Sequence, residues 1–249
     1  ITGTLATAAQ TNITSVGTLT GLTVQGTTPT LLYGNQQTIS NLQGLAIYNN
    51  QSGGLLDTTL VYGNGANSYF AIGHHNGTSY AERFRISSDG SLSTPTLGTS
   101  NVRFGVNAGN SIASGGNYNT VVGDEAGTAI TTGDLNTFLG YNAGATTTTA
   151  SDNTGVGYNA GASITTGIQN TLIGSVAGDA LTDADYNVAL GYLALSADTL
   201  GSRSIAIGYN TLGVQNFTSA TNTYNVAVGH GAGASVTTGT QNTFLGGLA

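Results

Sequence analysis

A repeat of about 17 residues runs through the second half of the chain and constrains its fold more than any other feature. Nine aligned units follow one another from residue 101 to the last residue, with spacings of 18, 17, 17, 17, 17, 17, 21 and 17 residues. They begin at Asn101, Asn119, Asn136, Asn153, Asn170, Asn187, Ser204, Asn225 and Asn242. A unit this short cannot bury its own apolar face, so successive units must stack. The repeat therefore predicts a solenoid of stacked coils over residues 101–249.

Each unit carries the same pattern of residue types. The second position is always β-branched, the fourth is always apolar and the fifth is always Gly. This alternation predicts a short strand that ends at a corner requiring Gly. Ala at position eight, usually followed by Gly, predicts a second bend in a narrow coil. The later stretch, as in Ile130-Thr131-Thr132-Gly133, predicts a second strand and a third corner.

The third position of the unit bears on assembly. Neighbouring side chains of a strand point to opposite faces, so a solvated single solenoid should be polar at position three if positions two and four are inside. Seven of the nine units instead have an apolar residue there, and the exceptions are Arg103 and Gly155. We therefore expect positions two and four to line the coil interior and position three to form a subunit interface.

The first hundred residues lack this period. Apolar residues recur every third position from Ile13 to Leu22, which predicts an extended shaft or linker over residues 1–27. Short apolar runs separated by Asn, Gly and Ser turns predict an antiparallel β domain over residues 28–100. No segment has a helical pattern, so the predicted fold class is all-β.

Composition narrows the possible functions. Charged residues make up only 6% of the chain, Lys and Cys are absent, and the net charge is −7. Without a basic patch, nucleic-acid binding is not expected. The chain has no apolar run of about 18 residues, so membrane insertion is not predicted. Glu82 and Glu125 are the only glutamates and neither has an obvious partner, so we expect no enzymatic activity.

Two families have similar repeats. The unit Ser204-Ile205-Ala206-Ile207-Gly208-Tyr209 resembles the head repeats of trimeric autotransporter adhesins, whose somewhat shorter coils form a trimeric left-handed parallel β-roll. The longer pattern of residues 131–144 is more similar to bacteriophage tail fibres and spikes that end in a self-cleaving intramolecular chaperone. Residues 81–92 resemble a β segment of those fibres. The resemblance implies a homotrimeric structural segment of a virion tail fibre that displays or carries host-receptor binding. The alternative is a bacterial surface adhesin head or another extracellular fibre protein.

The sixth position of the unit supplies the candidate binding residues. It is aromatic in five units, and these residues are Tyr141, Tyr158, Tyr192, Tyr209 and His230. Aromatic faces on a rigid scaffold can bind a cell-surface glycan or an apolar protein surface with little loss of entropy. The alternative is that the tyrosines only pack over the Gly corners of neighbouring coils.

Metal and cofactor sites are not expected. His74 and His75 are neighbours in a predicted strand and should point to opposite faces. Asp179, Asp183 and Asp185 could offer oxygens to Ca²⁺, but the full calcium-repeat pattern is absent and a solvated turn is favoured.

Overall fold

The computed structural model describes residues 45–47, 58–60, 69–75, 80–87, 92–94 and 96–249. The chain divides into two units, Ile1–Gln43 and Gly44–Ala249, and every described residue belongs to the second. All regular elements in these ranges are strands, and they include no helix long and apolar enough to cross a bilayer. The predicted shaft over residues 1–27 lies outside the described residues.

An antiparallel sheet precedes the repeat array, as predicted. Its five strands lie in chain order, and each pairs with its neighbour in an antiparallel sense. They are β1 (Leu45–Ile47), β2 (Thr58–Leu60), β3 (Tyr69–His75), β4 (Tyr80–Ser87) and β5 (Leu92–Ser93). On β4 the Arg85 guanidinium donates to both oxygens of Glu82, at 2.8 and 2.6 Å.

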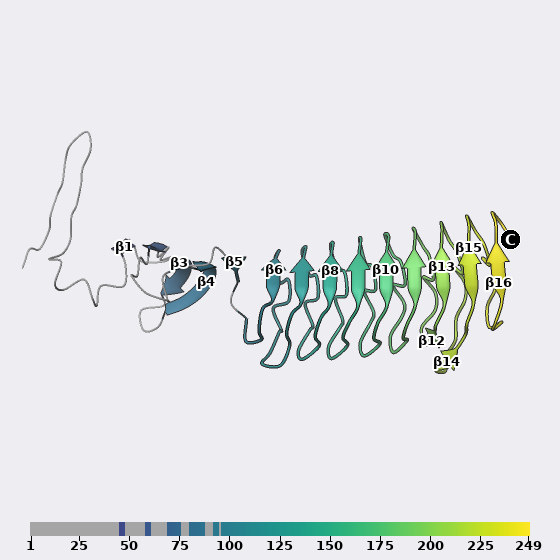
Figure 1. The fold of residues 1–249 in the computed structure, drawn as a ribbon, viewed down its shortest axis with the longest axis horizontal. Helices are drawn as coiled ribbons and strands as arrows, with labels where there is room; N and C mark the ends of the chain where they lie inside the picture. Colours follow the sequence, from purple (N-terminus) through teal and green to yellow (C-terminus); the bar gives the residue numbers. More distant parts are fainter. Residues whose placement is uncertain (1–44, 48–57, 61–68, 76–79, 88–91, 95) are drawn as a thin grey trace, which may run out of the picture. The chain divides into compact units, whose positions relative to one another are not determined.

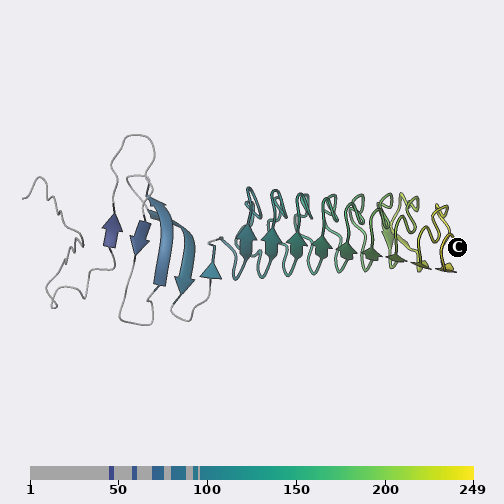
Figure 2. The same ribbon diagram turned by 90° about the horizontal axis from the view of Figure 1, so that it is seen from above.

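The repeat array is a parallel β-solenoid, which confirms the predicted fold class. Each coil contributes one three-residue strand to a nine-stranded parallel sheet, drawn as the row of parallel arrows in Figures 1 and 2. The strands are β6 (Val102–Phe104), β7 (Thr120–Val122), β8 (Thr137–Leu139), β9 (Thr154–Val156), β10 (Thr171–Ile173), β11 (Val188–Leu190), β13 (Ile205–Ile207), β15 (Val226–Val228) and β16 (Thr243–Leu245). Equivalent repeat positions pair across neighbouring strands, so identical columns of side chains run along the array.

The Gly at position five forms the predicted corner after each strand. Gly157 has φ of +134°, a region that L side chains avoid. A Cβ built on it would lie 2.5 Å from the carbonyl oxygen of Gly174 in the next coil. The close stacking of coils therefore excludes any larger residue in this column.

The prediction of which strand face is inside was wrong. Position three points into the coil, where Val121, Phe138 and Leu172 are fully buried, while positions two and four face outward. An alternating pattern shows that a strand has two faces but does not identify the inner one when both are apolar. The lumen holds position-three side chains that range in size from Ala189 to Phe138.

The side chains at positions three and nine are complementary in volume, so that together they fill the lumen. Phe138 occupies the space beside Gly144 and Gly155, where an added Cβ would lie 2.4 and 2.8 Å from its ring atoms. In two of the three coils whose position three is Ala, position nine is Leu195 or Leu212, both fully buried. These leucines adopt φ of +54° and +50°, so filling the lumen outweighs the backbone strain, which is about 1–2 kcal/mol for an L residue.

A buried ladder of asparagines joins the coils at position one. In Asn153, the backbone N–H and Nδ2 both donate to Asn136 Oδ1, at 3.1 and 3.2 Å. The same Nδ2 also donates to the Gly167 carbonyl at 2.9 Å. Asn170 then donates twice to Asn153 Oδ1, both times at 3.0 Å. Each amide thus bridges two coils and ties down a corner within its own coil.

The predicted second strand is absent from most described coils. The Thr-Thr-Gly stretch forms bends, and only the 17-residue unit from Asn187 and the 21-residue unit from Ser204 add a short pair, β12 (Gly201–Ser202) with β14 (Thr221–Asn222). At this edge, neighbouring coils are joined where one Thr donates two hydrogen bonds, from its backbone N–H and its hydroxyl, to a single carbonyl of the next coil. In Thr148, both the backbone N–H and Oγ1 donate to the Thr165 carbonyl, each at 3.1 Å. One such contact per coil does not make a strand ladder.

One hydroxyl is buried in the lumen without a hydrogen-bond partner among the described residues. Thr147 is fully buried in a column that neighbouring coils fill with Ile130 and Ile164, and its Oγ1 has no hydrogen-bond partner among the described residues. Thr147→Val keeps the shape and removes this polar atom, so we expect the free energy of unfolding to rise by about 1–3 kcal/mol. Urea unfolding followed by circular dichroism measures the change.

A matched control lies next to this residue. Thr146 Oγ1 donates to the carbonyls of Ala162 and Ile164, at 2.8 and 3.0 Å. Thr146→Val is therefore expected to lower stability. If Thr147→Val were no more stable than the parent chain, the buried hydroxyl would not lower the free energy of unfolding.

Candidate functional surfaces

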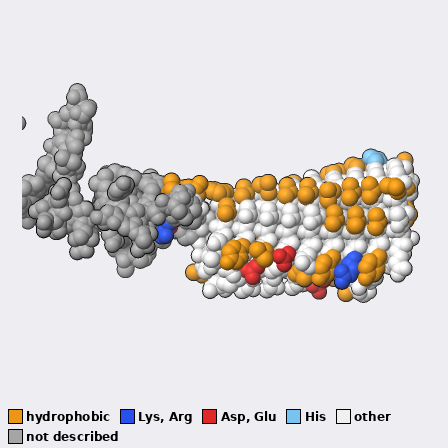
Figure 3. Space-filling model, in the orientation of Figure 1, with side chains coloured by type: hydrophobic (Ala, Val, Ile, Leu, Met, Phe, Trp, Pro, Cys, Tyr) orange, Lys and Arg blue, Asp and Glu red, His pale blue; other side chains and the backbone are white. Residues whose placement is uncertain are grey.

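The outward face of the parallel sheet carries an uninterrupted aliphatic and aromatic row. Position four supplies it in every coil, and Leu139 and Ile173 remain 47% and 40% exposed. The row consists of Phe104, Val122, Leu139, Val156, Ile173, Leu190, Ile207, Val228 and Leu245. Figure 3 shows a continuous line of hydrophobic side chains along the array. We call positions two and four of the sheet the outer strand face.

Position two forms a second row on the outer strand face. Its four consecutive threonines, Thr120, Thr137, Thr154 and Thr171, are followed by three aliphatic residues, Val188, Ile205 and Val226, and then by Thr243. None of the side chains in either row is ionisable. The outer strand face is therefore a long, neutral and largely apolar surface, of the kind that marks an interaction site.

The predicted aromatic column at position six lies on the surface, beyond the Gly corners. Tyr141 and Tyr158 stack with ring centroids 5.7 Å apart and planes within 9°. Tyr192 stacks on Tyr209 at 5.8 Å, and Tyr209 stacks on His230 at 4.8 Å. The structure brings the five predicted residues together as two separate stacks. The coil between the stacks has Ser175 at position six.

A second exposed column was not predicted. The residue before each position one has a positive φ, including Tyr118 at 57°, Tyr186 at 60° and Arg203 at 66°. The Arg203 guanidinium carbon lies 4.4 Å from the centroid of the Tyr186 ring, and Arg203 Nε donates to Asn222 Oδ1 at 2.9 Å. Large side chains at positive φ cannot be recognised from residue type, because Gly or Asn is the usual signal.

Of the three aspartates considered as calcium ligands, two accept hydrogen bonds from the preceding coil and the third is buried. Asp183 Oδ1 accepts from Thr166 Oγ1 at 2.6 Å, and Asp185 Oδ1 accepts from the Ile168 N–H at 2.8 Å. Asp179 Oδ1 is buried without a hydrogen-bond partner among the described residues, and burial raises the pKa of this carboxyl. No group of three potential metal ligands occurs in the part of the chain that the structure describes.

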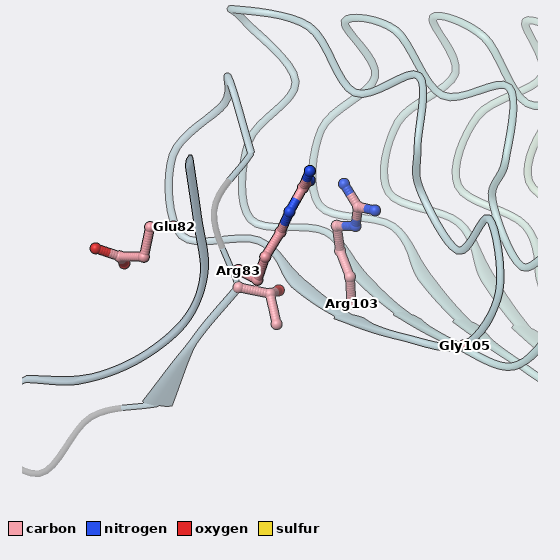
Figure 4. A pocket seen from close by; sticks show the side chains of 5 residues that line it. Glu82, Arg83, Arg103 and Gly105 are labelled. Carbon is pink, nitrogen blue, oxygen red and sulfur yellow. The ribbon is translucent and has the colours of Figure 1, made fainter. Parts of the chain in front are cut away.

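A pocket of about 200 Å³ lies where β4 and β5 meet the first coil. Figure 4 shows Arg83 and Arg103 extending to the same side, while Glu82 points away from them. Burial, followed by the charge of Arg83, lowers the pKa of Arg103, which holds position three of the first coil. Glu82 is already paired with Arg85. The pocket thus lacks the pair of facing carboxylates that glycoside hydrolysis uses.

Comparisons of the chain with protein-family models, curated proteins and solved structures find no match. The β-solenoid fold consequently rests on the geometry of the chain itself.

Proposed function

We propose that the chain is a structural segment of a phage-type tail fibre, in which three copies pack their outer strand faces together and carry host-receptor binding. The observation that supports this proposal is the neutral apolar face of the solenoid, which a single chain leaves exposed to water. The number of copies and the virion location follow the resemblance of the repeats. We propose no catalytic activity for the segment, because the titratable groups of the described residues do not converge.

Another copy of this chain is the best-matched occupant of the outer strand face. The apolar rows repeat at the strand spacing of about 4.8 Å over nine strands, so a partner must offer apolar groups at the same spacing. A second copy has apolar groups at this spacing because it has the same sequence and fold. The face also has no ionisable group to select a charged partner.

The energetics favour assembly through many coils together. Fully burying a Val, Leu, Ile or Phe side chain contributes about 1.5–3 kcal/mol, and these residues are already roughly half buried. Nine such side chains give a gross gain on the order of 10 kcal/mol per copy, which is comparable with the 4–15 kcal/mol cost of association. The array therefore assembles only if most of its length is in contact.

The mass in solution tests the proposal. Light scattering and native mass spectrometry of the full chain should report three times the 24.8 kDa of one copy. A dimer would keep the contact between outer strand faces and reject the trimer. A monodisperse, folded monomer would reject the fibre assembly.

The runner-up is a bacterial surface adhesin head or extracellular fibre, supported by the likeness of residues 204–209 to adhesin head repeats. The two proposals share the fold and the assembly. The neighbouring gene sequence separates them, because a chaperone domain downstream favours the viral fibre and a membrane anchor favours the adhesin.

A further inference from the structure

The column of aromatic rings at position six is interrupted once, at Ser175. Tyr158 lies in the coil before Ser175 and Tyr192 in the coil after it. β9, β10 and β11 pair in register, so the three residues occupy equivalent places in successive coils. A ring is therefore missing from an otherwise regular stack.

The spacing of the coils leaves room for one ring at this place. Two strand spacings separate Tyr158 from Tyr192 along the array, which is about 10 Å. Stacked rings have centroids about 4.5–7 Å apart, so one inserted ring can stack on both tyrosines at once. The pairs already present, at 5.7 and 5.8 Å, show that this column accommodates such distances.

Both tyrosines keep one ring face available. Tyr158 stacks only on Tyr141, and Tyr192 stacks only on Tyr209, among the described residues. Their exposed fractions are 53% and 50%. The free faces are those on the side of the intervening coil.

Two polar groups beside the gap have no partner. Ser175 Oγ makes no hydrogen bond within the described ranges. Asn159 Oδ1 accepts from Asn142 Nδ2 at 2.9 Å, but the next coil has Val176 where a further amide would continue the series. Asn159 Nδ2 is thus left as an unused donor in the described part of the chain.

We propose that Tyr158, Ser175 and Tyr192 form a subsite that binds one neutral pyranose ring of a surface glycan. The C–H faces of the sugar would stack on the two tyrosines, and its hydroxyls would bond to Ser175 Oγ and Asn159 Nδ2. A neutral sugar fits because positions six and seven carry no charged residue in the coils from Asn136 to Ser204. The choice of a glycan rests on the proposed role in host attachment.

The test uses the full chain and a panel of free sugars: glucose, galactose, mannose, N-acetylglucosamine and N-acetylgalactosamine. We expect saturation-transfer NMR to show binding of at least one of them. Ser175→Tyr should abolish that binding, because the new ring completes the stack without removing any contact of the fold. Tyr158→Ala and Tyr192→Ala should each weaken it at least tenfold.

Tyr118→Ala is the matched control, because Tyr118 is an exposed tyrosine in the other column. It should leave the affinity within twofold. Absence of binding by every sugar of the panel to the folded parent chain would overturn the proposal, as would unchanged binding by Ser175→Tyr with an unchanged melting temperature.

The same samples keep this inference separate from the fibre proposal. A trimer that binds no sugar would reject the subsite and leave the fibre assembly standing. A monomer that binds a sugar through Tyr158 and Tyr192 would reject the assembly and leave the subsite standing.

Discussion

A chain carrying Leu139→Asp and Ile173→Asp is expected to be a folded monomer at concentrations where the parent chain is a trimer. Both side chains face outward, so the two carboxylates stay hydrated when the chain is alone. Between packed outer strand faces each would be a buried, unpaired charge, which costs several kcal/mol per ion. Copies related by symmetry would also bring these charges together. Light scattering should report one third of the parent mass, with an unchanged circular dichroism spectrum.

The control places the same charge elsewhere on the surface. Tyr118→Asp and Leu135→Asp alter the column that precedes position one, which already contains Asp152 at a positive φ. Both residues are exposed, and this variant is expected to keep the parent mass. If Leu139→Asp with Ile173→Asp also kept the parent mass, the outer strand faces would not be in contact.

The sequence predicts the period, the corner and the strand because each depends on a local requirement. Gly157 must be Gly for its φ and for its closeness to Gly174, so the requirement repeats in every coil as a column of one residue type. The orientation of the strand depends on volume instead. Position three fills the lumen with side chains that range from Ala189 to Phe138, and nothing local to Leu139 or Ile173 marks them as outside.

Some of the candidate surfaces can likewise be predicted from the sequence, and others cannot. The aromatic column follows from spacing alone, and its interruption is already visible as Ser175 in a run of tyrosines. The column of Tyr118 and Arg203 requires a backbone dihedral that their residue types do not indicate. The asparagine ladder had a clear signal, since eight of the nine units begin with Asn, but a side chain that bridges coils is apparent only once they are stacked.

The ladder also has one interruption, and the structure repairs it with another side chain. Ser204 donates its backbone N–H to Asn187 Oδ1 at 2.9 Å but has no amide to pass on. In the lumen of the same 21-residue unit, Gln215 Nε2 donates to Ser204 Oγ at 2.9 Å, and Gln215 Oε1 accepts from Asn225 Nδ2 at 2.7 Å. Gln215 thus takes the place of the missing asparagine. Its Nε2 also bonds to Asp198 Oδ2 at 2.6 Å, and Asp198 is fully buried.

Gln215→Leu should consequently be among the most destabilising single changes in the array. Leu fits a column that is otherwise largely aliphatic, so volume is preserved. The loss instead comes from Asp198 Oδ2 and Asn225 Nδ2, which each lose one buried hydrogen-bond partner, at about 1–3 kcal/mol each and more for a charged group. We expect the free energy of unfolding to fall by about 3–6 kcal/mol, measured by urea unfolding. Adding Ser204→Asn should recover part of this loss, because the new amide can link Asn187 to Asn225 directly. A loss below 1 kcal/mol for Gln215→Leu would mean that pairing of β13 with β15 alone holds the long coil in register.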